Sequence, residues 1–569
     1  MIGVFLCGCD GEVSERIDLK WLGEVAERDP DVGYLETDEH LCSKEAVRKI
    51  RSIVESKNLD RIVIAGCSPR THEKIFDDLA PIVEFANIRE QAAWVHPEKE
   101  EATRVAADIL QSAIVRAKLA AELEAVRVPI EPSCLVIGGG VSGMQAASDL
   151  SAQGYRVYLV ERDERLGGRV KRLSMTFPTI SCGFPCRHDC PECELTPKEE
   201  ELYASEFVEI LTSTEVMGVE GRIGDYHVTL RTPEGVREIK VGTVVIATGT
   251  KTYDPSRIPE YGYEFEDVIT SIELEDLYMK HRFLGGGGEL RRPSDDAIPK
   301  RVDFIQCVGS RGEKGGNPYC SIVCCLYGIG HARAIKEMHP ACEVYLHFTN
   351  IQAPYRGFEE YYKESESLGV NFVRGEVKLV EKGEEGLVIT YEDVDLQKSF
   401  EEATDLVVLS VGQEPSDGAK ELAELFYREL DPDGFFTEVN QKIVREDATG
   451  VFVAGCALGP RNIRYAVADG KIAAENALAL LKKGEFEMEG IMPIVDDTKC
   501  IGCNICGNLC YFGAIGVTEE IAEVVEGKCR GCGICAAACP EKAITLTQFD
   551  DEEITAQIEV FARAGEVSG

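Results

Sequence analysis

The feature that most constrains this chain is a cysteine pattern near its C-terminus that occurs twice. The spacing C-x2-C-x2-C-x3-C is made first by Cys500, Cys503, Cys506 and Cys510 and again by Cys529, Cys532, Cys535 and Cys539. In such a doubled pattern three close thiolates bind one 4Fe–4S cubane, and the fourth crosses over to bind the other. We therefore predict two 4Fe–4S clusters. One is held by Cys500, Cys503, Cys506 and Cys539, and the other by Cys529, Cys532, Cys535 and Cys510.

This spacing is typical of the bacterial two-cluster ferredoxins, so we expect residues 489–550 to form an α+β domain of that type. Pro540 follows the last cysteine, whereas Tyr511 takes the place of the usual proline after the first run. That change should remove no ligand. A zinc site is the alternative for so many thiols, but the doubled run disfavours it.

The cysteine content and the net charge limit which compartment, ligands and partners this protein can have. The 569 residues include 23 cysteines, and there is no run of about twenty apolar residues that could span a membrane. The apolar start Ile2–Leu6 is too short for a signal peptide and has no basic residues before it, so we expect a cytoplasmic protein. Disulfides rarely persist there, and clustered cysteines then indicate metal or cluster ligation. A net charge of −39 opposes binding to nucleic acid or anionic lipid.

A second motif predicts a dinucleotide-binding unit. The apolar run Cys134–Ile137 leads into the turn Gly138-Gly139-Gly140-Val141-Ser142-Gly143. In such a turn the first glycine bends the chain, the second admits a pyrophosphate, and the third lets the following helix pack on the strand. The next apolar run ends at Glu161, where an acidic side chain can bind ribose hydroxyls. The candidate residues are Gly138, Gly140, Val141, Ser142, Gly143, Glu161 and Arg162.

Three further segments accompany this motif, and the glycine pair and the C-terminal one favour FAD over a nicotinamide nucleotide at this site. They are Gly167-Gly168-Arg169, whose glycine pair lets a flavin ring lie against the backbone, Ala247-Thr248-Gly249, and Gly455-Cys456-Ala457. Together these segments resemble the flavoproteins with two dinucleotide-binding domains, the thioredoxin reductase and glutathione reductase group. One departure is Cys456, which stands where an aspartate usually binds the ribityl chain. Cys456 either tunes the flavin or is a small packing residue, and an empty Rossmann-like unit is the alternative to a flavin site.

The nicotinamide site of that group has no counterpart in this sequence. The run Arg301–Cys307 is followed by Val308-Gly309-Ser310-Arg311-Gly312, which lacks the required glycine spacing. A second cysteine group takes this place, formed by Cys307, Cys320, Cys324 and Cys325. Its spacing predicts a cluster, with buried free thiols as the alternative.

Two more cysteine groups are candidate cluster sites. Cys182, Cys186, Cys190 and Cys193 share a proline-containing loop that suits a cluster or zinc. The N-terminal group, either a cluster site or scattered thiols, consists of Cys7, Cys9, Cys42 and Cys67. Cys134 and Cys342 lie in apolar runs and are expected in the core. We therefore expect FAD, two 4Fe–4S clusters in the C-terminal repeat and three further 4Fe–4S clusters.

These patterns divide an α/β chain into seven segments. Residues 1–96 are a small α/β domain with the first cysteines, and 97–131 are a connecting helix. Residues 132–300 and 411–488 are the two parts of the FAD-binding domain, separated by a central α/β domain at 301–410. The ferredoxin domain at 489–550 is followed by a charged tail at 551–569.

Several short motifs, taken together, point to one known family. They are Gln306-Cys307-Val308-Gly309-Ser310-Arg311, Gly316-Asn317-Pro318-Tyr319-Cys320-Ser321, Val323-Cys324-Cys325, Cys67-Ser68-Pro69-Arg70 and Cys190–Lys198. Over nearly its whole length the chain resembles the A-type subunits of the heterodisulfide reductases. The resemblance implies clusters at the N-terminal and 307–325 sites. It also implies an FAD-bearing hub that forms a homodimer within a larger complex. The partners implied are subunits of the B and C type and a small iron–sulfur electron donor linked to a hydrogenase or dehydrogenase.

Two features depart from that family. Its members commonly carry an additional ferredoxin domain inserted in the flavoprotein part, whereas Glu200–Val245 runs through with no such cysteines. Cys182 and Cys186 are additional to the usual pair, Cys190 and Cys193. In several members the flavin bifurcates electrons. This chain lacks the inserted ferredoxin domain, which is one route by which electrons can leave the flavin, so bifurcation does not follow from the resemblance alone.

We predict an electron-transfer hub in which FAD exchanges electrons between a partner donor and the clusters. No general acid, base or nucleophile is evident, and the nine histidines lack metal-binding spacing, so they are taken as surface or packing residues. One alternative is a stand-alone flavin enzyme that reduces a disulfide or sulfur compound with Cys324-Cys325 or with Cys190 and Cys193. The other is a structural scaffold, which the ferredoxin repeat disfavours.

Overall fold

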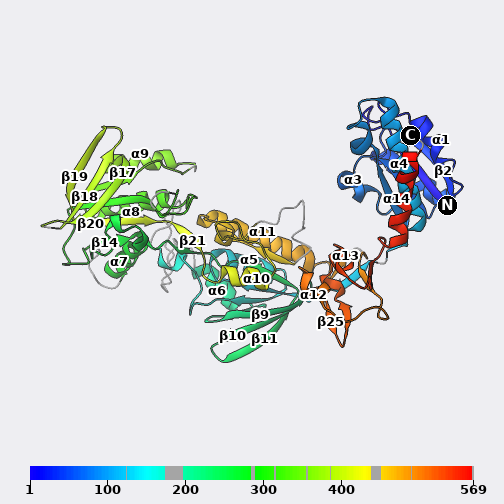
Figure 1. Ribbon diagram of the computed structural model, residues 1–569. Coiled ribbons are helices and arrows are strands. Elements are labelled where there is room, and N and C mark those ends of the chain that lie inside the picture. Colours follow the sequence, from blue (N-terminus) through cyan, green and yellow to red (C-terminus); the bar gives the residue numbers. More distant parts are fainter. Residues whose placement is uncertain are drawn as a thin grey trace. The chain divides into compact units, whose positions relative to one another are not determined.

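The computed structural model describes residues 1–123, 125–173, 196–283, 289–312, 315–353, 356–384, 386–437, 450–488 and 490–566. Its contacts divide the chain into two units (Figure 1), Met1–Arg127 together with Glu487–Gly569, and Val128–Phe486. The first unit thus joins the two ends of the chain, and the second is the continuous segment between them. Strands β5 (Val126–Pro129) and β23 (Glu485–Met488) carry the chain from one unit to the other.

The N-terminal part of the first unit is a four-stranded parallel sheet in the order β2-β1-β3-β4. Its strands are β1 (Ile2–Cys7), β2 (Val32–Asp38), β3 (Arg61–Gly66) and β4 (Ile82–Asn87). The apolar runs β1 and β3 are buried because helices cover both faces of the sheet. The helices are α1 (Leu19–Ala26), α2 (Lys44–Lys57), α3 (Pro69–Phe76) and α4 (Lys99–Leu119).

Helix α4 is part of the core of this domain, which differs from the connecting helix predicted for 97–131. Its alanine-rich face packs with Ile2, Val4 and Leu6 of β1. The helix ends at Leu119, and β5 follows instead of further helical turns. An amphipathic pattern shows that a helix has an apolar face but does not show which surface that face covers.

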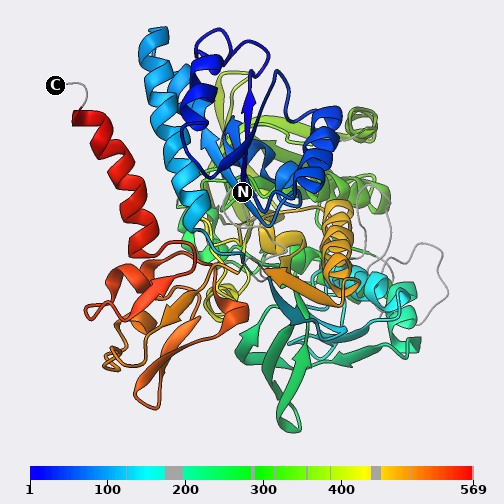
Figure 2. The same cartoon turned by 90° about the vertical axis from the view of Figure 1, so that its right-hand side faces the viewer.

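The C-terminal part of the first unit carries the cysteine repeat. Two antiparallel strand pairs frame it, β24 (Pro493–Val495) with β27 (Ile544–Leu546) and β25 (Ile515–Thr518) with β26 (Ile521–Val524). The third cysteine of each run lies in a short helix, α12 (Ile505–Leu509) or α13 (Ile534–Ala538). The last helix, α14 (Asp551–Glu566), packs on α4 (Figures 1 and 2), where the guanidinium of Arg116 lies 4.8 Å from the ring centre of Phe549.

The second unit begins with a five-stranded parallel sheet in the order β22-β12-β6-β7-β8. Its strands are β6 (Ser133–Ile137), β7 (Arg156–Val160), β8 (Val208–Leu211), β12 (Thr243–Ile246) and β22 (Val451–Val453). Alternate residues of β6 pack against different layers. Cys134 and Val136 contact the layer of α5 (Val141–Ala152) and α11 (Ile463–Leu481), whereas Leu135 and Ile137 contact the opposite layer.

That opposite layer is an antiparallel sheet, accompanied by a short helix. It consists of β9 (Glu215–Arg222), β10 (Asp225–Thr232), β11 (Gly235–Val241) and α10 (Ala419–Leu425). Helix α6 (Thr196–Ala204) contacts α5 on the other side. The glycine turn at 138–143 therefore joins β6 to α5 in the middle of a three-layer domain, as the motif predicts.

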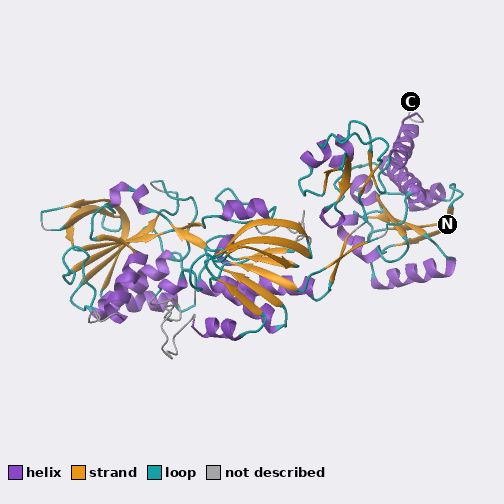
Figure 3. Cartoon of the chain, turned by 90° about the horizontal axis from the view of Figure 1, so that it is seen from below, coloured by secondary structure: helices purple, strands orange, loops and turns teal. Residues whose placement is uncertain are grey.

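A seven-stranded sheet forms the rest of the second unit, in the order β14-β20-β15-β16-β17-β18-β19. The strands are β14 (Val268–Thr270), β15 (Arg301–Val308), β16 (Glu343–Phe348), β17 (Val370–Lys382), β18 (Leu387–Asp393), β19 (Lys398–Thr404) and β20 (Leu406–Val411). Helices α7 (Ser271–Phe283), α8 (Cys324–Met338) and α9 (Phe358–Ser367) cover one face (Figure 3). Because β14 and α7 belong here, the domain starts before the predicted boundary at residue 301. The paired strands β13 (Thr250–Thr252) and β21 (Gln413–Pro415) lie where the chain enters and leaves it.

Candidate functional site

A cavity of about 670 Å³ lies in the second unit. Its walls are the glycine turn, the segments around β13 and β21, and the helices α7 and α8. This size is within the range of sites that enclose a large organic ligand. Many of the residues predicted for the flavin line it, namely Gly138, Gly140, Val141, Ser142, Glu161, Arg162, Gly167, Gly168, Arg169, Ala247, Thr248, Gly249 and Cys456.

The glycine turn leaves space where the motif requires it. Gly140 has ordinary backbone angles, φ −76° and ψ −179°, and a Cβ atom added to it would meet no atom within 4 Å. By contrast, a Cβ on Gly143 would lie 1.8 Å from the carbonyl oxygen of Gly138, because α5 packs closely on the turn. Gly138 has a φ of +106°, which favours glycine. The three glycines thus provide the bend, an open approach and close packing.

Glu161 is buried at the end of β7 and holds the glycine turn in place. Its carboxylate accepts hydrogen bonds from the backbone N–H of Gly139 at 2.7 Å and from that of Asp163 at 2.9 Å. These bonds satisfy a carboxylate whose burial would otherwise be costly. A carboxylate can accept further bonds, and Glu161 lines the cavity, so the binding of ribose hydroxyls stays a prediction.

Arg169 and Cys456 form part of the cavity wall. The guanidinium of Arg169 donates to the hydroxyl of Thr250 at 3.1 Å. The thiol of Cys456 donates to the carbonyl of Arg461 at 3.5 Å, and burial raises its pKa. Cys456 is therefore a neutral group beside a half-buried cation.

Three predicted flavin residues do not line the cavity. Gly143 and Gly455 serve close packing, since a Cβ on Gly455 would lie 2.0 Å from Oγ of Ser142. Ala457 is buried in the core next to the five-stranded sheet. Their contribution is to position the residues that do face the cavity.

The cysteines predicted between 307 and 325 converge at the end of β15 and the start of α8. The thiol of Cys324 is close enough to those of Cys307, Cys320 and Cys325 to interact electrostatically with all three. Backbone N–H groups donate to two of the sulfurs, from Ile322 to Cys320 at 3.3 Å and from Gln352 to Cys325 at 3.5 Å. Such N–H···S bonds are among the interactions that tune iron–sulfur clusters.

This cysteine group lies beside the cavity. Val323 and Tyr327, from the start of α8, line the cavity wall. The hydroxyl of Tyr327 donates to the carbonyl of Val411 at 2.7 Å, and the thiol of Cys324 lies 3.9 Å from the same oxygen. Burial lowers the pKa of Arg169, and the nearby Cys456, Tyr327 and Cys324 oppose that shift, which places Arg169 close to both the cavity and the cysteines.

The repeated C-terminal cysteines also come together across the two runs. One small hollow is lined by Cys500, Cys503, Cys506 and Cys539. Cys510 of the first run interacts electrostatically with Cys529 of the second. Backbone N–H groups donate to the sulfurs of Cys510, Cys529 and Cys539 at 3.2, 3.4 and 3.3 Å.

In the N-terminal domain, Cys7, Cys9 and Cys67 meet at the C-terminal ends of β1 and β3. A hydrogen bond from Cys9 lowers the pKa of Cys7 to about 6, in spite of burial. Burial raises the pKa of Cys67, with the guanidinium of Arg89 opposing it. Cys42 is exposed in the turn before α2.

Cys182, Cys186, Cys190 and Cys193 lie outside the described residues. Within the described ranges, no three His, Cys, Asp or Glu side chains are spaced to hold a single metal ion. A 4Fe–4S cluster needs a different arrangement, because each thiolate binds a different iron. Cys134 and Cys342 are buried, as predicted.

Helices α7 and α8 contribute two cavity residues that no motif predicted. Nε2 of His331 lies 2.8 Å from Oε1 of Glu275, and their side chains are 4% and 1% exposed. Both line the cavity. His331 is buried and packed on Glu275, so the prediction that every histidine is a surface or packing residue, with no acid–base group evident, is not contradicted and stays a prediction. The residues of this pair are far apart in sequence, so no local signal could have joined them.

The cavity residues fit a flavin dinucleotide. Gly140 leaves room for a pyrophosphate, and the hydroxyl of Thr248 is buried with no hydrogen-bond partner among the described residues, so it can bond to a ligand. The fold and these groups define an FAD-dependent iron–sulfur oxidoreductase.

Comparison with known proteins identifies the family. Residues 132–287 match the family described as pyridine nucleotide-disulphide oxidoreductase, and residues 522–545 match the 4Fe-4S binding domain. The chain is 36% identical to the A-type subunit of the H(2):CoB-CoM heterodisulfide,ferredoxin reductase of Methanothermobacter marburgensis, over 98% of this chain and 97% of the relative. It is 34% identical to the A-type iron-sulfur subunit of the CoB--CoM heterodisulfide reductase of Methanocaldococcus jannaschii, over 92% of each. The chain therefore belongs to the family of heterodisulfide reductase A-type subunits and is an FAD- and iron–sulfur-containing electron-transfer protein.

Among solved structures, thioredoxin reductase of T. acidophilum is similar to 61% of this chain and 99% of its own, at 17% identity and a TM-score of 0.41. That of Lactococcus lactis covers 62% of this chain and 100% of its own, at 16% identity and a TM-score of 0.40. Among the described helices, none is both long enough and apolar enough to cross a bilayer.

Proposed function

We propose that the cavity binds FAD and that this chain is the electron hub of a heterodisulfide-reductase-like complex. Gly138, Gly140 and the start of α5 would hold the pyrophosphate through backbone N–H groups and the N-terminal end of the helix. Glu161 would hold the ribose, and Gly168 and Arg169 would lie at the ring. When bound, FAD exchanges electrons in pairs or singly, which suits a junction between different carriers.

The proposal includes three 4Fe–4S cluster sites whose cysteines lie within the residues that the structure describes. Two are the crossed sets of the ferredoxin repeat, Cys500, Cys503, Cys506 and Cys539, and Cys529, Cys532, Cys535 and Cys510. The third is Cys307, Cys320, Cys324 and Cys325. We extend the proposal to clusters on Cys7, Cys9, Cys67 and Cys42 and on Cys182, Cys186, Cys190 and Cys193, with Cys42 as the least secured ligand because of its exposure.

One observation carries the proposal, the position of Cys324 next to the cavity. Tyr327 lines the cavity, and its hydroxyl meets the same carbonyl of Val411 as the thiol of Cys324. A cluster bound by Cys307, Cys320, Cys324 and Cys325 would therefore lie where it can accept single electrons from FAD bound in the cavity. Tyr327 and Val411 fix the start of α8, on which both Cys324 and Cys325 are carried.

The names of the relatives suggest the surroundings of this hub. These names describe reductases of the CoB-CoM heterodisulfide, and several of them also name ferredoxin. We propose that this chain works in the cytoplasm as a homodimer within a complex that contains subunits of the B and C type and a small iron–sulfur donor protein. Electron bifurcation or confurcation at the flavin is part of the proposal.

An anaerobic redox titration tests this function, with FAD followed optically and the clusters followed by electron paramagnetic resonance. Uptake of both electrons by FAD in one narrow potential range supports bifurcation, and two well-separated one-electron steps support a simple relay. Cys324→Ser should remove one cluster signal and slow the oxidation of reduced FAD, whereas Cys342→Ser, a buried cysteine outside every group, should leave both unchanged. Absence of bound FAD in the purified chain would refute the proposal.

The alternative, a stand-alone disulfide reductase, needs an accessible thiolate beside the flavin. Cys324 and Cys325 are 4% and 5% exposed, and burial raises the pKa of both thiols. This environment opposes a redox-active pair. A count of alkylatable thiols in the cluster-intact protein separates the two functions, since ligated cysteines do not react.

A further inference from the structure

We propose that Arg311 sets the reduction potential of the cluster on Cys307, Cys320, Cys324 and Cys325. Its guanidinium raises this potential and so makes the cluster a better acceptor for electrons that leave FAD. The inference rests on the proposed cluster site and adds to it an electrostatic function for one side chain that ligates nothing.

The loop that carries Arg311 connects two of the four cysteines. The backbone N–H of Arg311 donates to the carbonyl of Tyr319, the residue before Cys320, at 2.9 Å. The next N–H, that of Gly312, donates to the carbonyl of Asn317 at 2.7 Å. These bonds tie the start of the loop to its end, so the backbone of Arg311 is fixed next to that of Cys320.

The side chain of Arg311 reaches the sulfurs at the end of β15. Its Nη1 donates to the hydroxyl of Thr349 at 3.1 Å, and Thr349 and Cys307 line the same small hollow. Burial raises the pKa of Cys307 to about 11, and Arg311 opposes that shift by its charge and by a hydrogen bond to the sulfur. Burial also raises the pKa of Cys325, again with Arg311 opposing it. The guanidinium therefore lies close to two of the four sulfurs.

The backbone of Arg311 adopts a strained conformation at this place. Its φ is +70°, in the left-handed region that favours glycine. A residue with a large side chain stays in that region only where surrounding contacts hold it. The contacts with Thr349 and Cys307 are of this kind. Glycine would form the same turn without strain, so the turn itself does not require arginine.

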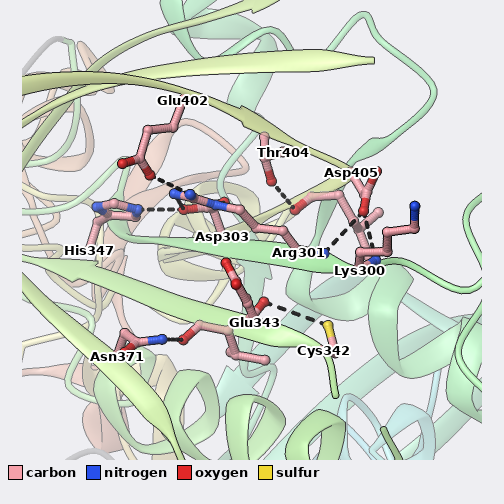
Figure 4. Close-up of polar contacts among 12 residues, drawn as sticks. Lys300, Arg301, Asp303, Cys342, Glu343, His347, Asn371, Glu402, Thr404 and Asp405 are labelled. Atoms are coloured by element: carbon pink, nitrogen blue, oxygen red, sulfur yellow. Dashed lines mark hydrogen bonds and ion pairs between the residues drawn. The ribbon is translucent and has the colours of Figure 1, made fainter. Parts of the chain in front are cut away.

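The charge of Arg311 is placed differently from that of the arginine at the start of the same strand. Arg301 donates to Asp303 at 2.9 Å and also pairs with Glu402, so carboxylates offset its charge (Figure 4). Among the described residues Arg311 forms no ion pair, and its side-chain partners are Thr349 and Cys307. Within this part of the chain, its charge therefore faces cysteine sulfurs.

Reduction of the cluster is the step that this charge favours. The cluster takes up one electron, from reduced FAD or from dithionite in a test, and no bond forms or breaks. The cluster and its thiolates thereby gain one negative charge, which a chain with a net charge of −39 disfavours. A neighbouring cation and a hydrogen bond to sulfur stabilise the added charge, so they raise the potential.

Arg311 and Arg169 act on different cysteines of this group. Arg169 lines the flavin cavity and interacts electrostatically with Cys324. Arg311 interacts with Cys307 and Cys325 and is not among the described residues of the cavity wall. A change at Arg311 should therefore move the potential of the cluster relative to that of FAD.

The test is an anaerobic redox titration of the full chain, with the cluster followed through the paramagnetic signal that Cys324→Ser removes. We expect Arg311→Gln to keep this signal and to bind FAD in the wild-type amount. At a given potential its ratio of reduced to oxidised cluster should be about tenfold lower, a shift of about 59 mV for one electron. The FAD potential should not change. Arg311→Lys keeps the charge and should retain most of the wild-type cluster potential.

Arg333→Gln is the matched control. Arg333 is a half-buried arginine of α8, about 13 Å farther along the helix than Cys324. It pairs with Glu364 at 3.1 Å, so a carboxylate offsets its charge. Its removal should leave the potentials of the cluster and of FAD unchanged.

The outcomes separate this inference from the proposed function. If no paramagnetic signal depends on Cys324, the proposed cluster site fails. If the signal is present but Arg311→Gln has the wild-type potential, or Arg333→Gln shifts it equally, only the role of Arg311 is refuted. A potential of Arg311→Lys as low as that of Arg311→Gln would also refute the role of its charge.

A second variant decides if Arg311→Gln does not retain the cluster. Arg311→Gly also removes the charge, and glycine adopts a φ of +70° without strain. A retained cluster with a lowered potential supports the inference. A wild-type potential, or loss of the cluster in this variant too, would show that Arg311 is a structural residue and would refute it.

Discussion

Replacing Gly140 by alanine should separate the binding of FAD from the folding of the chain. The added Cβ meets no atom within 4 Å, and the backbone at Gly140 has angles that alanine adopts without strain. The folded chain should therefore tolerate the change within about 0.5 kcal/mol, as at an unconstrained site. The new methyl group would instead occupy the space where we place the pyrophosphate.

The size of the effect follows from the hydrogen bonds that are lost. A hydrogen bond between a backbone N–H and a charged phosphate contributes about 1.5–3 kcal/mol. If the methyl group displaces the pyrophosphate so that one such hydrogen bond is lost, FAD binds about 10- to 150-fold more weakly, because 1.4 kcal/mol corresponds to a factor of ten in affinity.

Two other glycines make the assay specific. Fluorescence titration with FAD measures affinity, and denaturant unfolding of the FAD-free chain measures stability. Gly143→Ala places a Cβ 1.8 Å from the carbonyl oxygen of Gly138, so it should cost about 1–3 kcal/mol or more of stability. Gly516→Ala, in the ferredoxin repeat, also meets nothing within 4 Å and should change neither quantity.

Two results would refute this reasoning. Wild-type FAD affinity in Gly140→Ala would mean that the pyrophosphate does not bind at the glycine turn. A loss of stability as large as that of Gly143→Ala would mean that Gly140 is a packing position, contrary to the open space around it.

Three further predictions concern clusters and buried charge. Cys539→Ser should weaken the same paramagnetic signal as Cys503→Ser, and Cys510→Ser the other one; the reverse pairing would exclude crossed ligation. Burial alone would raise the pKa of Asp303, but His347 and Arg301 outweigh it and hold the pKa below its usual value. This carboxylate therefore adds stability that is present above pH about 4 and is lost as pH falls. Asp303→Asn should cost about 3–5 kcal/mol at neutral pH in denaturant unfolding, and a neutral result would show that the pair contributes nothing. Arg169→Gln removes a cation near the proposed ring, so spectroelectrochemistry should find the FAD potential lower by about 30 mV, equal to 1.4 kcal/mol for two electrons; an unchanged potential would place the guanidinium away from the ring.

The sequence was sufficient for features whose residues must be neighbours in the chain. The cysteine repeat can be assigned because a cubane needs its first three ligands within one tight turn, and the glycine turn can be assigned because a strand, a bend and a helix follow one another directly. The parallel strand β6 and helix α5 lie where the turn predicts them. The extent of α4 could not be predicted, because its end and its partner surface depend on β1.

Only the tertiary structure brought together side chains at the cavity that lie far apart in the sequence. Cys324 comes to lie beside the cavity because α8 packs on the seven-stranded sheet with its first turn toward Val411. Glu275 meets His331 because α7 packs against the same sheet face. No periodicity or spacing connects residues so far apart in sequence; the burial of two apolar helix faces against one sheet brings them within hydrogen-bond distance.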